Sequence, residues 1–141
     1  MTCPQCDTEV VAFAVSDALR THAPERTAVA SLCPNCLAVE AVDADGPKAI
    51  AGDGGPDFSR VHESFPDGDG GVAFALLIGT LPSIALNKES AQALRERAER
   101  EGVDVALAFD RLIDAVDGAE IVPEFDLRRR VRQLDSLLDG S

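Results

Sequence analysis

The chain has 141 residues, which is enough for one ordinary domain or for a small metal-stabilised unit beside a second compact one. Its 25 acidic residues outnumber its 13 basic residues, and the formal net charge of −12 lacks the basic footprint of most nucleic-acid-binding proteins. The longest apolar run, Val72–Leu86, is interrupted by Gly79, Thr80, Pro82 and Ser83, so we expect a buried core segment and no membrane span.

Lysine is scarce among the basic residues, with only Lys48 and Lys88 beside eleven arginines. An acidic excess with so little lysine is typical of proteins from a very salty cytoplasm, where 1 M salt screens charges over about 3 Å. We therefore expect a halophilic source and a cytoplasmic location. In that setting the net charge describes solubility more than it describes partners.

Two short cysteine motifs carry the strongest chemical signal in the chain. Residues 3–6 read Cys-Pro-Gln-Cys and residues 33–36 read Cys-Pro-Asn-Cys. Two such turns can supply four thiolates to one tetrahedral ion, and four protein ligands leave no open position for water or substrate. The spacing predicts that Cys3, Cys6, Cys33 and Cys36 hold one Zn²⁺ per chain in a structural site.

Other chemistries of the same cysteines remain open at this stage. Disulfides require an oxidising compartment, and the start of the chain does not resemble a signal peptide. A redox dithiol is an alternative for either pair alone. A rubredoxin-like iron electron carrier uses the same spacing, but such sites are surrounded by aromatic residues, whereas this chain has no Trp or Tyr and only Phe13 between the pairs.

Strands are predicted around the two motifs. The segment Val10–Val15 would place Val11, Phe13 and Val15 on one face, because side chains alternate along a strand. Further strands are predicted at Thr27–Leu32 and Leu37–Val42, with an excursion from the sheet at Ser16–Arg26.

Residues 1–42 resemble the zinc-ribbon family, in which two Cys-x-x-Cys knuckles are joined by strands. Glycine often follows the second cysteine of a knuckle in that family, whereas Asp7 and Leu37 stand there in this chain. Asp tolerates the left-handed conformation better than Leu does, so we expect the second knuckle to be the less regular one.

The composition changes abruptly after residue 42. Residues 43–71 contain seven of the eleven glycines, three prolines and six aspartates, which predicts a linker or loop that includes the glycine-rich stretch Asp67–Gly71. Within it, Phe58, Val61 and Phe65 are spaced like a helical turn, so we expect this part to pack onto a neighbouring element.

The last seventy residues are predicted to be helical. The expected helices are Val72–Gly79, Lys88–Glu101, Val105–Val116 and Leu127–Leu138. The first is apolar on all sides, which indicates a central buried helix. Asn87, Asp104 and Asp126 are expected to cap the other three, and Gly102 is expected to end the second.

Together these elements predict an α+β protein, with an antiparallel zinc ribbon at residues 1–42, a linker at 43–71 and a small helical bundle at 72–141. The ribbon, the Gly/Asp-rich connector and the block Leu81–Lys88 together resemble an uncharacterised family of small zinc-ribbon proteins from halophilic archaea. That resemblance implies no activity.

Candidate functional residues outside the cysteines are few. His22 and His62 lack an obvious nucleophile beside them, so we expect no enzyme. A basic cluster near the C-terminus lies along an apolar helical stripe, which is typical of a solvated helix face but also allows contact with a partner or nucleic acid. The cluster consists of Arg128, Arg129, Arg130 and Arg132. We expect another protein as partner, with a nucleic-acid-associated regulator as the alternative.

Overall fold

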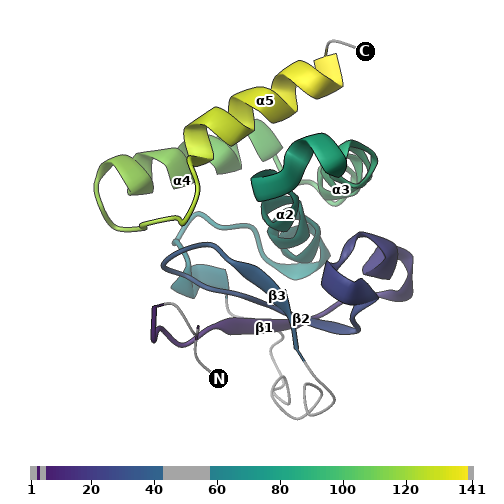
Figure 1. Cartoon of the computed structure of the whole chain (residues 1–141), viewed down its shortest axis with the longest axis horizontal. Coiled ribbons are helices and arrows are strands. Elements are labelled where there is room, and N and C mark those ends of the chain that lie inside the picture. Colours follow the sequence, from purple (N-terminus) through teal and green to yellow (C-terminus); the bar gives the residue numbers. More distant parts are fainter. Residues whose placement is uncertain (1–2, 4–5, 43–57, 140–141) are drawn as a thin grey trace.

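The computed structural model describes residues 3, 6–42 and 58–139, without the side chains of residues 138 and 139. Figure 1 shows a small three-stranded sheet on one side and a layer of helices on the other, with α2 between the sheet and the outer helices. The α+β prediction is therefore confirmed. Most of the predicted linker, residues 43–57, lies outside the described residues.

The sheet consists of β1 (Val11–Ala14), β2 (Val29–Leu32) and β3 (Val39–Ala41), all antiparallel in that order. The alternation in β1 buries Val11 and Phe13, as predicted, and each position of the central strand β2 is buried. Val11 and Phe13 pair with Leu32 and Ala30 of β2, and these four residues form the face on which the helices pack.

The excursion predicted between β1 and β2 is present as two 3₁₀ helices, η1 (Asp17–His22) and η2 (Pro24–Arg26). Leu19 of η1 is buried in the core, and the Nδ1 atom of His22 lies 2.8 Å from the Oγ atom of Ser90. This excursion therefore connects the sheet side of the molecule to the helical side.

Helix α2 spans Gly68–Thr80 and is buried along most of its length, which confirms the prediction of a central apolar helix. The loop predicted at Asp67–Gly71 was wrong, because the Gly71 amide already donates to the Asp67 carbonyl oxygen (3.0 Å) as part of the first helical turn. A Cβ atom at Gly71 would collide with the Pro66 carbonyl oxygen. Glycine is thus required here for close packing and does not mark a loop.

Helix α2 continues into the 3₁₀ helix η4 (Leu81–Leu86). The run Gly68–Leu86 has a mean hydropathy of 1.6 and is long and apolar enough to cross a membrane by length and composition alone. In this fold 61% of its apolar window is buried inside the protein. The run forms the centre of the core, against which α3 and the sheet pack.

A chain of phenylalanine rings joins the two layers. The 3₁₀ helix η3 (Phe58–Arg60) places Phe58 between Phe13 of β1 and Phe65, and Phe65 contacts Phe74 of α2, which in turn contacts Phe109. Successive ring centroids are 5.6, 5.0, 5.2 and 4.7 Å apart. The expected packing of the segment around Phe58 is confirmed, and a single hydrophobic cluster includes both sheet and helices.

The remaining helices are α3 (Lys88–Arg100), α4 (Val105–Asp117) and α5 (Leu127–Asp139). Asp104 and Asp126 cap as predicted, since each Oδ1 atom accepts a hydrogen bond of 3.1 Å from a backbone amide of the first turn. Asn87 occupies the predicted N-cap position of α3, but its side chain does not cap the helix, because its amide donates instead to the Ser83 carbonyl oxygen (2.9 Å) of the kinked η4. Gly102, at φ +94°, ends α3 as expected.

Candidate metal centre

The two cysteine motifs fold into turns with the same backbone hydrogen bonds. In each turn the first cysteine accepts from the residue four positions later and donates to the residue five positions later. The four bonds are Asp7 N to Cys3 O (2.9 Å), Cys3 N to Thr8 O (2.8 Å), Leu37 N to Cys33 O (3.0 Å) and Cys33 N to Ala38 O (2.9 Å). We call the described residues of these turns the first knuckle (residue 3 and residues 6–8) and the second knuckle (residues 33–38).

Both knuckles close with a residue in the left-handed conformation, Asp7 at φ +53° and Leu37 at φ +60°. The expectation that Leu37 would make the second knuckle less regular was therefore wrong. This conformation costs a non-glycine residue about 1–2 kcal/mol. Leu37 is only 1% exposed, and burying a leucine side chain stabilises the fold by about 1.5–3 kcal/mol, which offsets the backbone cost.

The knuckles bring the four cysteine sulfur atoms together, all within 4.8 Å of one another. The Sγ atoms of Cys3 and Cys36 are 3.7 Å apart, and none of the four cysteines is in a disulfide. A tetrahedral ion with bonds of about 2.3 Å separates its sulfur ligands by about 3.8 Å. The donor set and its spacing thus fit a metal ion bound by four thiolates.

Burial favours the protonated form of the buried cysteine thiols. Loss of solvent raises the pKa of Cys33 and Cys36, although backbone amides near both sulfurs act in the opposite direction. One of these is the Cys36 amide, which donates to the Cys33 sulfur (3.4 Å). Without a cation the buried thiols are therefore held neutral, and a bound metal must displace their protons.

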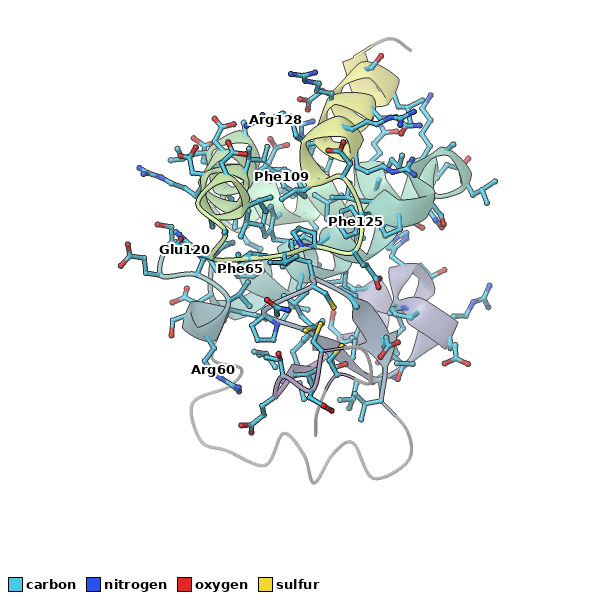
Figure 2. The ribbon with its side chains drawn as sticks, turned by 60° about the vertical axis from the view of Figure 1, so that its left-hand side comes forward. Arg60, Phe65, Phe109, Glu120, Phe125 and Arg128 are labelled. Atoms are coloured by element: carbon cyan, nitrogen blue, oxygen red, sulfur yellow. The ribbon has the colours of Figure 1, made fainter. Side chains whose placement is uncertain are left out.

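The second knuckle is also hydrogen-bonded to a segment far away in the sequence. The connection between α4 and α5 runs beside it, so that the Val122 amide donates to the Asn35 carbonyl oxygen (2.8 Å) and the Glu124 amide donates to the Cys36 carbonyl oxygen (3.2 Å). In Figure 2 this connection, between the labelled Glu120 and Phe125, passes beside the yellow sulfur atoms. Sequence reasoning missed this support, because neither segment has a regular pattern that marks it as paired.

The C-terminal arginines lie on α5, which Figure 1 shows on the outer side of the helical layer, away from the sheet. Arg128 donates to Asp117 (2.6 Å) and Arg130 to Gln133 (3.0 Å). Arg129 and Arg132 are exposed and have no ion-pair partner within the described part of the chain. The structure therefore does not bring this cluster into the cysteine site.

The two histidines also lie outside the cysteine group. His22 contacts Ser90, and the Nδ1 atom of His62 accepts a hydrogen bond from the Ser64 amide (3.0 Å). Among the described residues, the cluster able to hold a metal consists of the four cysteines alone.

Comparison with known proteins identifies a family for this chain. A family model described as "Family of unknown function (DUF6276)" matches residues 2–138. No curated protein and no solved structure matches the chain. Because the match extends over nearly the whole sequence, the chain belongs to this family of unknown function.

Proposed function

We propose that the protein is a non-enzymatic module, stabilised by one structural Zn²⁺, that binds another protein. The observation that carries this proposal is the closed set of four buried or half-buried thiols on two matching knuckles. Four thiolates complete a tetrahedral shell, so the ion would hold the fold and would not bind substrate. The three-stranded sheet beside the knuckles supports the resemblance to zinc ribbons.

Zinc is preferred over iron because of what surrounds the sulfurs. Among the described residues, the partly buried hydrophobic side chains packed against the cysteine cluster include Val10 and Ala38 and no aromatic one, whereas rubredoxin-like sites are rich in aromatic residues. Four thiolates in a tetrahedral arrangement suit either ion, so the metal content of the purified protein decides between them.

Elemental mass spectrometry on untagged protein decides between the two metals. We expect about one zinc per chain, and we expect its loss in the Cys33→Ser variant together with loss of order in the sheet. A visible absorption band with stoichiometric iron would replace this proposal by the electron-carrier alternative. Protein that contains neither metal after expression with both would contradict a metal-stabilised module.

The absence of an enzymatic role is proposed from the histidine environments. His22 and Ser90 form a pair across the two layers, yet within the described ranges no carboxylate contacts the His22 ring to orient it. A serine nucleophile needs a base that is itself held in place, and this pair lacks the third group.

Partner binding is tested by cross-linking the metal-loaded protein in native extract at molar salt and identifying the captured chains. A reproducible partner supports the proposal, and cross-linking to nothing but itself would contradict it. The nucleic-acid alternative rests on the exposed Arg129 and Arg132. If replacing both by alanine leaves retention on DNA and RNA unchanged, that alternative loses its support.

A further inference from the structure

A cavity opens between the end of α4, the start of α5 and the connection between them. Its volume is about 530 Å³, within the range of sites that bind small ligands or protruding side chains. Most of its lining is apolar, contributed by Ile113, Val116, Ile121, Val122, Phe125 and Leu127. Val122 is 60% exposed, so the cavity presents apolar surface at its mouth.

The polar groups at the rim give the cavity a definite charge preference. Asp117, Asp126 and Arg128 line it, and Arg128 donates to Asp117 at 2.6 Å, so the charges of these two offset one another. Among the described residues Asp126 has no ion-pair partner, so its carboxyl group is not offset at the rim, and the exposed Glu120 and Glu124 lie on the same connection without lining the cavity. The rim is therefore acidic around an apolar floor.

The charge of the rim also disfavours a second copy of this chain as the occupant of the cavity. A second copy is poorly complementary to an acidic rim, because it has only 13 basic residues beside 25 acidic ones to place in short-range contact with it. A segment that carries Lys or Arg beside apolar side chains is complementary in both respects.

The cavity wall is connected to the cysteine site. Val122 lines the cavity, and its amide and that of Glu124 donate to carbonyl oxygens of the second knuckle. The shape of this wall consequently depends on the order of that knuckle, which a bound metal would stabilise.

We infer that this cavity is the docking site for an apolar, basic segment of the partner protein, and that the second knuckle holds its wall in place. The inference rests on the proposed interaction function and names the class of partner segment.

Because the protein contains no Trp or Tyr, a peptide with one tryptophan can be followed by its own fluorescence in the presence of the full-length protein. The probe is Lys-Leu-Trp-Leu-Lys, with Glu-Leu-Trp-Leu-Glu as the charge-reversed control, both at physiological ionic strength with folding checked by circular dichroism. We expect a blue-shifted, saturable signal for the basic peptide and at least about tenfold weaker binding of the acidic one. Equal binding of the two peptides, or binding of neither, would overturn the inference.

Two matched variants locate the site. Val122→Arg places a positive charge at the mouth of the cavity and should weaken binding of the basic peptide about tenfold. Leu86→Arg makes the same change at another exposed apolar residue, 89% exposed and outside the cavity lining, and should leave binding unchanged. Equal effects of both substitutions would contradict the assignment.

Failure of this inference is distinguishable from failure of the proposed function. If cross-linking captures a partner and Val122→Arg captures it equally well, the module binds proteins through another surface and the docking site is wrong. If no partner and no metal are found, the proposed function itself fails, whatever the peptides do.

Discussion

The two knuckles have the same backbone hydrogen bonds but differ in how the rest of the protein supports them. In the first, Cys6 is half-buried and Asp7 is exposed. In the second, Cys33, Cys36 and Leu37 are all at most 3% exposed. The same local geometry can thus be held mainly by the turn and its cysteine ligands, as in the first knuckle, or by burial of the turn in the core, as in the second.

The contacts around each knuckle explain this difference. Leu37 belongs to the main hydrophobic cluster, and the α4–α5 connection donates two hydrogen bonds to the second knuckle. The segment between the first knuckle and β1 is contacted by Arg60, labelled in Figure 2, which donates to the Glu9 carbonyl oxygen (3.1 Å) from an exposed position. We therefore expect the first knuckle to depend more strongly on the metal.

Metal removal should have the largest effect. In zinc-finger peptides, structural zinc contributes about 10–16 kcal/mol of apparent binding free energy. After chelation, hydrogen exchange at the Cys3 and Asp7 amides should become fast, while the Cys33 and Leu37 amides keep part of their protection because the core still holds them. Equal loss of protection in both knuckles would contradict the comparison.

Glycine substitution at the left-handed position should change the free energy of unfolding in opposite directions in the two knuckles. Leu37→Gly relieves about 1–2 kcal/mol of backbone strain but loses about 2–5 kcal/mol of core packing, so the free energy of unfolding should fall. Asp7→Gly relieves the strain at an exposed residue and should raise stability by up to about 1 kcal/mol. Urea denaturation of the metal-loaded proteins measures both values, and destabilisation by both substitutions would show that the two knuckles are supported alike.

Loss of the Val122 amide should weaken the support of the second knuckle. Val122→Pro removes the donor to Asn35, at a cost of about 1 kcal/mol, and should release metal to a competing chelator several-fold faster. Val122→Ala keeps the amide and trims an exposed side chain, so it serves as the control. Unchanged release from the proline variant would mean that the connection does not stabilise the site.

The smallest effect is expected away from both knuckles, at His22. Burial lowers the pKa of His22 below its ordinary value of about 6.5, so the unfolded chain binds more protons than the folded protein in that range. Stability should therefore fall as the pH drops through about 6.5 and level off below the pKa of the folded state.

Denaturation of the metal-loaded protein between about pH 5 and about pH 8, a range that brackets the ordinary histidine pKa, measures this slope. His22→Gln should flatten it, whereas Ser90→Ala should keep it, because desolvation of the ring and not its hydrogen bond to Ser90 lowers the pKa. A slope unchanged in His22→Gln would assign the pH dependence to another group.

Several features were predictable because they depend on neighbouring residues. Alternation in residues 11–15 predicts the buried face of β1, and Asp104 and Asp126 cap their helices through the adjacent turn. Distant contacts overturned the prediction for Leu37, whereas at Gly71 and Asn87 the nearby backbone decided. The first turn of α2 already includes Gly71, which lies against Pro66, and the kink of η4 places the Ser83 carbonyl oxygen within reach of the Asn87 side chain.

The sequence by itself determined the four thiols and their grouping into two short turns, because ligand spacing in a turn is a local property. Only the tertiary structure decided that Leu37 closes the second knuckle in a left-handed conformation and that the α4–α5 connection supports it. Both depend on contacts between segments far apart in the chain, where the free energy of burial outweighs a local conformational preference.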